Sequence, residues 1–177
     1  MVKERRRELS GAVLREKSAA ICAAVMELPE FRAADEVFVY MDCKGEVSTK
    51  PLIEEAWRLG KKVAAPKVEG EDMSYYYISS YLDVEDGYFH VPEPKTDKPA
   101  VGKSAEKALL IVPGVGFDPK RNRCGYGKGF YDRYLAAHPE HMTVALAFDF
   151  QIVDEVPTRP EDIRPMMLVT ESRIFIQ

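Results

Sequence analysis

Short apolar runs that alternate with helical patterns are the feature of this sequence that most constrains its fold. Each run is rich in residues that favour β-strands. A run such as Ala-Leu-Leu-Ile-Val at 108–112 is typical of a parallel strand covered on both faces. Because strands alternate with helices, the sequence predicts an α/β protein with a mainly parallel sheet. The predicted strands cover residues 37–41, 63–65, 75–78, 108–112, 143–148 and 166–170.

The segments between these runs show helix signals. Apolar residues recur at spacings of three and four from Leu14 to Leu28, and Pro29 ends that pattern. Pro51 and Gly60 bracket a second helix in the expected order. The predicted helices cover 14–28, 51–59 and about 129–137, and the proline-rich, charged residues 92–104 are predicted to form a surface loop. At 177 residues the chain suits one domain over residues 1–177.

Charge and composition exclude several classes of protein. The chain has 25 lysines and arginines against 29 aspartates and glutamates, and the net charge of −4 argues against a nucleic-acid partner held by bulk charge. Its longest uncharged stretch, residues 108–117, is shorter than the about 20 residues of a membrane span. The N-terminus shows a charged helical pattern where a signal peptide would be apolar. Three widely spaced cysteines indicate neither disulfides nor zinc. We therefore expect a cytoplasmic protein without a membrane partner.

A basic, glycine-rich loop precedes the third predicted helix. Gly125, Gly127 and Gly129 alternate with other residues, and the segment 120–133 holds five cations against one anion. Glycine lets the backbone approach a ligand closely, and free N–H groups at a helix start attract anions, so phosphate binding is one interpretation. The spacing matches neither the Walker pattern nor the GxGxxG dinucleotide pattern. A flexible turn with a solvated basic face is the other interpretation, and spacing alone leaves both open.

Several isolated charged residues are candidates for binding. Asp132, one turn into the helix, can hold Mg²⁺ beside a phosphate or act as an ordinary helix-surface carboxylate. A second metal ligand can come from the acidic cluster between residues 149 and 162, although such clusters are often solvated. Glu46 follows a predicted strand, where it can pair with N–H donors of a heterocycle or remain hydrated. Lys3 and Arg7 lie four residues apart on one face of a charged helix.

In order and spacing, these segments resemble the 5-formyltetrahydrofolate cyclo-ligase family, also called methenyltetrahydrofolate synthetase. The resemblance covers nearly the whole chain, and its most specific motif is Arg-x-Gly-Tyr-Gly-Lys-Gly-x-Tyr-Asp at 123–132. The weaker motifs follow in the family's order: the basic first helix, Glu46-Val47-x-Thr49, Pro66-Lys67-Val68, Glu93-Pro94, Val112-Pro113-Gly114, Phe117-Asp118, Asp162 and Thr170-Glu171.

The resemblance implies a three-layer α/β/α fold, similar to the architecture of phosphosugar isomerases and CoA transferases. It also implies one reaction, in which MgATP drives 5-formyltetrahydrofolate to 5,10-methenyltetrahydrofolate with release of ADP and phosphate. The formyl oxygen attacks the γ-phosphate, and N10 then closes the ring as phosphate leaves, so no protein nucleophile is required. The implied partners are the small molecules ATP and reduced folate, with Mg²⁺ as cofactor, and we expect a monomer.

Carried over motif by motif, the resemblance implies the site residues. Those implied for ATP are Lys3, Arg7, Arg123, Cys124, Gly125, Tyr126, Gly127, Lys128, Gly129, Phe130 and Tyr131. Those implied for the folate are Met41, Glu46, Tyr126, Gly127, Lys128, Gly129 and Phe130. Asp132 and Asp162 are the implied Mg²⁺ ligands, and Lys128 and Arg123 are the implied catalytic residues, which oppose phosphate charge.

Two rival interpretations keep the fold and change the function. One is an enzyme related to phosphosugar isomerases or CoA transferases, since fold is a poor indicator of function. The other is a non-catalytic module that binds RNA or protein. The acidic net charge and the intact block at 123–132 weigh against the second.

Overall fold

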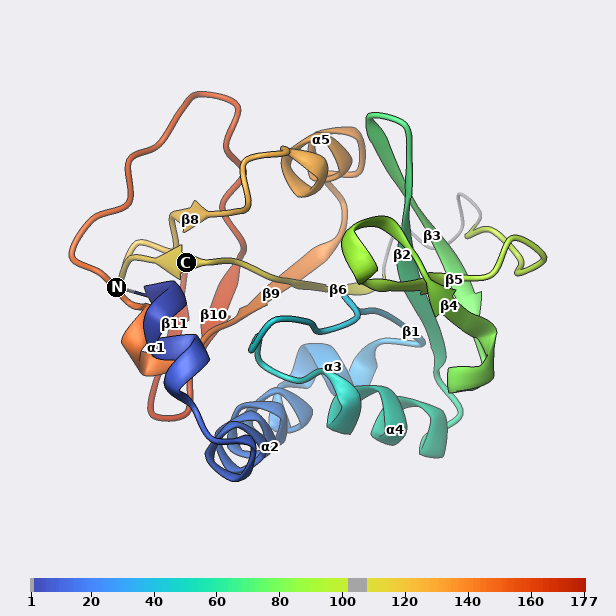
Figure 1. Ribbon diagram of the computed structural model, residues 1–177, viewed down its shortest axis with the longest axis horizontal. Helices are drawn as coiled ribbons and strands as arrows, with labels where there is room; N and C mark the ends of the chain where they lie inside the picture. Colours follow the sequence, from blue (N-terminus) through green and yellow to red (C-terminus); the bar gives the residue numbers. More distant parts are fainter. Residues whose placement is uncertain (1, 102–107) are drawn as a thin grey trace.

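A computed structural model of the chain, which describes residues 2–101 and 108–177, is built around one central sheet (Figure 1). The strand order is β11-β10-β9-β6-β1-β2-β3. The strands are β1 (Glu36–Phe38), β2 (Lys62–Glu69), β3 (Asp72–Ile78), β6 (Leu109–Val112), β9 (Met142–Leu146), β10 (Met167–Val169) and β11 (Ile174–Ile176). The inner strands run parallel, and antiparallel β3 and β11 form the two edges. The predicted mainly parallel sheet is confirmed.

Strand β6 explains why the sheet lies in the middle of the molecule. All of its residues are buried. Leu109 and Ile111 belong to the core on one face, and Leu110 and Val112 belong to the core on the other. Because successive side chains of a strand alternate between the two faces, a wholly apolar strand requires cover on both sides.

Helices supply this cover on both faces of the sheet (Figure 1). They are α1 (Val2–Glu8), α2 (Gly11–Glu27), α3 (Pro29–Ala33), α4 (Lys50–Arg58) and α5 (Phe130–Ala137), with short 3-10 turns η1 (Tyr81–Asp83), η2 (Tyr88–His90) and η4 (Asp149–Gln151). Ile21 of α2, Phe31 of α3 and Leu52 of α4 pack into one core, whereas Leu135 of α5 packs into the other. The expected three-layer α/β/α arrangement is therefore confirmed, with one helix layer thicker than the other.

Two small hairpins lie outside the main sheet: β4 (Val84–Asp86) pairs with β5 (Pro92–Pro94), and β7 (Gly116–Phe117) pairs with β8 (Arg123–Cys124). The prediction of a loop over residues 92–104 is therefore wrong at its start. Proline cannot donate to a strand ladder, but β5 has a single neighbour and can carry proline on its free side. Residues 102–104 lie outside the described residues.

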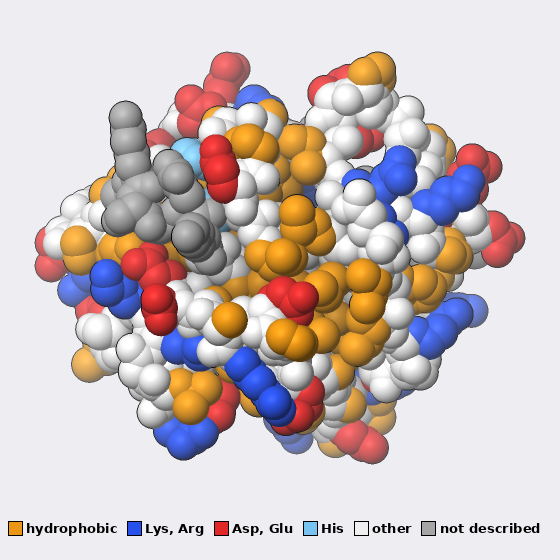
Figure 2. Space-filling model, turned by 180° about the vertical axis from the view of Figure 1, so that it is seen from behind, with side chains coloured by type: hydrophobic (Ala, Val, Ile, Leu, Met, Phe, Trp, Pro, Cys, Tyr) orange, Lys and Arg blue, Asp and Glu red, His pale blue; other side chains and the backbone are white. Residues whose placement is uncertain are grey.

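The surface on one side of the molecule mixes charges of both signs. In Figure 2, Lys and Arg side chains alternate with Asp and Glu side chains around the rim of that face. The described residues on this face form no continuous basic surface. Within residues 2–101 and 108–177, no helix is both long and apolar enough to cross a membrane.

The loops that carry the candidate residues leave the sheet at the carboxyl ends of its parallel strands. The loop after β1 covers residues 39–49, the loop after β6 starts at residue 113, and η4 follows β9. These loops lie together because the carboxyl ends of parallel strands all point to the same side of the sheet, which is where α/β sheets bind ligands. The predicted strand at 37–41 is shorter than expected, since the sheet pairing of β1 ends at Phe38.

Candidate active site

The loop after β1 carries a buried carboxylate, Glu46. Its Oε2 accepts a hydrogen bond from the N–H of Cys43 at 2.9 Å, and its Oε1 accepts one from the hydroxyl of Tyr126 at 2.8 Å. The residue is only 6% exposed, and burial raises the pKa of its carboxyl group although these hydrogen bonds act in the opposite direction. Glu46 is therefore a positioned acceptor and not a hydrated surface carboxylate.

The turn that positions Glu46 packs closely against helix α1. Lys44 and Gly45 have positive φ angles of 49° and 75°. A β-carbon at position 45 would lie 3.2 Å from the carbonyl oxygen of Arg6. Glycine at this position satisfies both the backbone angle and the close approach.

The glycine-rich loop over residues 123–129 leads directly into α5. Gly127 and Gly129 have φ angles of 85° and 69°, in the left-handed region that favours glycine. Gly129 caps α5 without a side-chain hydrogen bond, so no capping side chain occupies the first N–H groups of the helix. Lys128 is exposed beside them, and no ion pair among the described residues includes it. This arrangement suits a bound anion.

Tyr126 connects the glycine-rich loop to the loop after β1. Its hydroxyl donates to Glu46 and accepts a hydrogen bond from Nη1 of Arg6, each at 2.8 Å. The ammonium of Lys3 lies 6.0 Å from the centroid of the Tyr126 ring. Burial, with the Glu46 carboxylate nearby, raises the pKa of Tyr126, so the phenol remains a neutral donor near pH 7. The two loops therefore belong to one site.

Arg6 is a residue of this site that sequence reasoning missed. It is buried, whereas the other cations of α1, Lys3, Arg5 and Arg7, are exposed. Its Nη2 donates to the carbonyl oxygen of Gly114 in the loop after β6. Its Nε is buried and has no hydrogen-bond partner among the described residues. The sequence shows four cations within one short helix, and only the packing of the helix distinguishes Arg6 from the others.

Arg123 and Asp132 form an ion pair at the base of the glycine-rich loop. Nη2 of Arg123 lies 2.9 Å from Oδ1 of Asp132, which also accepts a hydrogen bond from the N–H of Ile163 at 3.0 Å. The two charged side chains are 5% and 22% exposed, respectively. The Arg123 guanidinium also lies 5.8 Å from the ring centroid of Tyr131. A phosphate or metal ion would have to share these groups with their protein partners.

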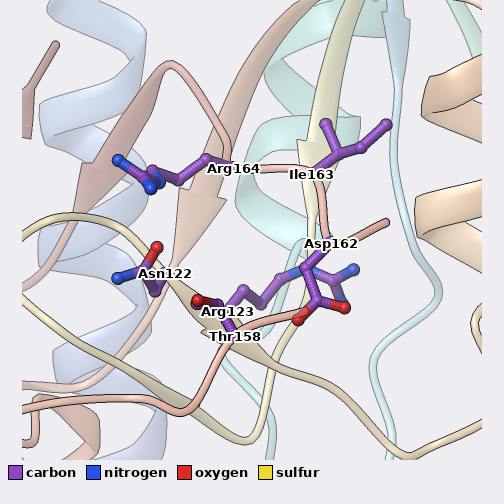
Figure 3. A pocket seen from close by; sticks show the side chains of 6 residues that line it. All are labelled: Asn122, Arg123, Thr158, Asp162, Ile163 and Arg164. Atoms are coloured by element: carbon purple, nitrogen blue, oxygen red, sulfur yellow. The ribbon is translucent and has the colours of Figure 1, made fainter. Parts of the chain in front are cut away.

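A small pocket lies beside this pair and is shown in Figure 3, lined by Asn122, Arg123, Thr158, Asp162, Ile163 and Arg164. Oδ2 of Asp162 accepts a hydrogen bond from the N–H of Arg159 at 2.7 Å. Because Ile163 contacts Asp132, the structure brings the two predicted metal ligands to the same region. No group of three or more His, Cys, Asp or Glu residues suited to a metal ion occurs within the described ranges.

A family model described as the 5-formyltetrahydrofolate cyclo-ligase family matches residues 1–171. The chain belongs to this family. Among its relatives, 5-formyltetrahydrofolate cyclo-ligase of Escherichia coli (strain K12) is 32% identical, and the match covers 99% of both chains. A probable 5-formyltetrahydrofolate cyclo-ligase of Schizosaccharomyces pombe is 33% identical over 95% of this chain and 90% of the relative. As a member of a cyclo-ligase family, the protein is an enzyme of the ligase class.

Solved structures of similar proteins have the same fold as this cyclo-ligase. The NMR structure of 5,10-methenyltetrahydrofolate synthetase from Aquifex aeolicus superimposes with a TM-score of 0.86 at 34% identity, covering 99% of this chain and 88% of that one. A 5,10-methenyltetrahydrofolate synthetase from Mycoplasma pneumoniae superimposes with a TM-score of 0.77 at 19% identity, covering 96% of this chain and 94% of that one, and supports the fold alone.

The structure separates the predicted site residues of this cyclo-ligase into two groups. In one group Tyr126 donates a hydrogen bond to Glu46 and the Lys3 ammonium lies 6.0 Å from the Tyr126 ring centroid; in the other Arg123 is paired with Asp132. Other predicted residues do not take part in these contacts. Met41 is buried in the core, Arg7 and Gly127 are exposed, and among the described residues the Cys124 thiol donates only to the neighbouring carbonyl of Gly125, at 3.7 Å.

An aromatic segment in η2 faces the cyclo-ligase site and was not singled out from the sequence. The Tyr88 and Phe130 rings meet edge to face at 6.3 Å. The ammonium of Lys44 lies 5.8 Å from the ring centroid of Phe89, whose φ of 56° is unusual for a bulky residue. Both rings of η2 are exposed. The pair of adjacent aromatic residues within a polar segment is the signal that could have identified them.

Proposed function

We propose that the enzyme uses ATP to convert 5-formyltetrahydrofolate to 5,10-methenyltetrahydrofolate, releasing ADP and phosphate. Family membership supports a cyclo-ligase activity. The observation that carries the proposal is the hydrogen bond between Tyr126 and Glu46, because it joins an anion-binding loop to a buried carboxylate acceptor. A reaction between a triphosphate and a heterocycle requires two such subsites side by side.

The triphosphate of ATP would bind at the glycine-rich loop and the start of α5. The left-handed turns at Gly127 and Gly129 expose backbone N–H groups, and α5 has no capping side chain. Lys128 adds an exposed positive charge, and Lys3 approaches the same loop through Tyr126. Arg7 lies one helical turn from Lys3 and adds charge on that side.

The reduced folate would bind against Glu46 and the aromatic rings beside it. A fixed carboxylate can accept hydrogen bonds from the ring N–H groups of a pterin, and Glu46 is held by two donors of its own. Tyr126 is half exposed and offers a ring face next to that carboxylate. Phe130 is partly buried and meets the Tyr88 ring edge to face, and we propose it as a second aromatic contact of the folate.

The protein's task in this reaction is to position and neutralise charge. The formyl oxygen of the folate carries amide electron density and would attack the γ-phosphorus while the bond from that phosphorus to ADP breaks. N10 then bonds to the formyl carbon and loses its proton, and the C–O bond breaks to release phosphate. Backbone N–H groups and Lys128 would stabilise the negative charge that accumulates on the transferred phosphoryl group. No step needs a nucleophile from the protein.

The carboxylates of Asp132 and Asp162 fit a Mg²⁺ ion that accompanies the nucleotide. In each carboxylate one oxygen already accepts hydrogen bonds, and no hydrogen bond from a described residue reaches the other oxygen. Mg²⁺ needs only one or two protein carboxylates when phosphate and water supply its other ligands. The ion, when bound, would neutralise phosphate charge. We propose Asp132 and Asp162 as its protein ligands.

The proposal is tested by mixing purified protein, MgATP and 5-formyltetrahydrofolate and following the absorbance of the methenyl product. We expect the absorbance to rise in proportion to the enzyme, with one ADP formed per methenyl group. The rise should stop when ATP is omitted. A folded protein that forms no methenyl product contradicts the proposed reaction.

Replacing Asp132 with asparagine is expected to raise the Mg²⁺ concentration needed for half-maximal rate by on the order of 10- to 100-fold, because a metal-binding carboxylate becomes neutral. A Mg²⁺ titration at saturating substrates measures the midpoint. Asp154→Asn removes an exposed carboxylate of the nearby acidic loop and serves as the matched control. An unchanged midpoint in Asp132→Asn would contradict the ligand role.

Replacing Glu46 with glutamine is expected to raise KM for 5-formyltetrahydrofolate by roughly 10- to 100-fold, since a hydrogen bond to a charged group contributes about 1.5–3 kcal/mol. Glutamine keeps the shape of the side chain, so KM for ATP should change little. Steady-state kinetics with each substrate varied in turn measure both constants. Glu16→Gln, at an exposed position of α2, is the control. Equal changes in the two KM values would remove Glu46 from the folate subsite.

A further inference from the structure

We propose that Arg6 is a positioning residue for this reaction, holding Tyr126 and thereby the Glu46 carboxylate in place between the two substrates. The inference rests on the proposed function and adds to it a residue that would touch neither substrate. Arg6 belongs to α1, which lies beside the glycine-rich loop (Figure 1). Through its side chain, Arg6 links α1 to both the glycine-rich loop and the loop after β6.

On one side Arg6 begins a chain of hydrogen bonds that ends at the folate subsite. Its Nη1 donates to the Tyr126 hydroxyl at 2.8 Å, and that hydroxyl donates to Oε1 of Glu46 at 2.8 Å. The N–H of Cys43 holds the other oxygen of Glu46 at 2.9 Å. The orientation of the Glu46 carboxylate thus depends on where Arg6 holds the phenol.

On the other side Arg6 is anchored to the loop after β6. The carbonyl oxygen of Gly114 accepts hydrogen bonds from Nη2 of Arg6 and, at 3.1 Å, from Nε2 of the buried Gln151. A β-carbon at position 114 would clash with the Phe117 ring, so glycine is required where the loop after β6 approaches that ring. Tyr126 itself is 48% exposed, and it gains a fixed position through its contact with Arg6.

Arg6 also places a positive charge beside Glu46. The titratable groups that interact electrostatically with this carboxylate are Arg6 of α1, Tyr126 of the glycine-rich loop, Tyr131 of α5, and Tyr40 and Cys43 of its own loop. Of these groups Arg6 alone is a cation. Burial raises the pKa of Glu46, and the positive charge of Arg6 opposes that rise, so Arg6 favours the ionised form of the carboxylate.

The test compares Arg6→Met with Arg5→Met, which removes the same charge from an exposed position of the same helix. We expect Arg6→Met to raise KM for 5-formyltetrahydrofolate about tenfold or more. We also expect the acid limb of kcat/KM for the folate to move to higher pH. Arg5→Met should match the wild type in both measurements, and Arg6→Lys should return the acid limb towards its wild-type position.

Tyr126→Phe interrupts the same chain of hydrogen bonds from a half-exposed position, so it provides the test even if Arg6→Met does not fold. In Tyr126→Phe, KM for the folate should rise, and the acid limb of the pH profile of kcat/KM should move to higher pH. The double variant should resemble the more affected single variant, because both changes break one connection.

Three results would overturn the role of Arg6: wild-type KM and pH profile in Arg6→Met, equal effects of Arg6→Met and Arg5→Met, or effects of Arg6→Met and Tyr126→Phe that simply add. In each case an active wild-type enzyme would leave the proposed function standing. An inactive wild-type protein would overturn both.

Discussion

Lys128→Ala is expected to lower kcat/KM for ATP by about 10²–10³-fold, the loss typical when a well-placed donor to developing charge is removed. Lys128 is exposed in the glycine-rich loop, directly before the residue that caps α5, and no ion pair among the described residues includes it. Its removal therefore leaves neither a cavity nor an unpaired buried charge, and the thermal unfolding temperature should stay at the wild-type value.

The matched control for this variant is Lys120→Ala. Lys120 is an exposed cation of the same loop region, so both variants change the net charge equally. We expect Lys120→Ala to keep nearly the full rate. If both variants lose the same activity, the loop acts only through its overall charge, and a wild-type rate in Lys128→Ala would remove that residue from the mechanism.

Arg123→Ala is expected to lower both the rate and the stability. The Arg123 side chain is 5% exposed, and its removal leaves Asp132, which is 22% exposed, without its cation. Breaking a fully buried pair costs about 3–5 kcal/mol, and because Asp132 retains some contact with water we expect about 2–3 kcal/mol here. The rate should fall by about 10²–10³-fold if the guanidinium also opposes phosphate charge. Thermal unfolding and steady-state kinetics measure the two effects.

The double variant Arg123→Ala/Asp132→Asn separates these two roles. It removes both charges, so much of the lost stability should return because no unpaired carboxylate remains. The rate should remain low, since the proposed phosphate and Mg²⁺ contacts are both missing. A folded Arg123→Ala protein with the wild-type rate would restrict Arg123 to a structural role.

The parallel sheet was predictable because its inner strands are apolar on both faces. The run at 108–112 is the clearest case, and it forms the wholly buried β6. The sequence signals of the two edge strands, β3 and β11, were weaker. The predicted strand at 75–78 proved to be part of β3, but nothing in its residues indicated its antiparallel direction. Strand β11 was missed because it is short and exposed, with Ile174 and Ile176 at 44% and 63%.

The candidate site was predictable where residue type alone implied chemistry. The glycine-rich loop was recognised from its alternating glycines and cations, and Glu46 was placed at a strand end. The burial of Arg6 could not be foreseen, because it depends on how α1 meets the loop after β6. The ion pair between Arg123 and Asp132 likewise depends on the path of the loop between them.

A crystal structure with Mg²⁺ and a non-hydrolysable ATP analogue tests most directly whether the glycine-rich loop binds the triphosphate next to Glu46, the proposed acceptor for the folate. We expect the phosphates to contact Lys128 and the backbone N–H groups at the start of α5, with Mg²⁺ on Asp132. A triphosphate bound elsewhere, with residues 123–129 free of ligand, would contradict the account.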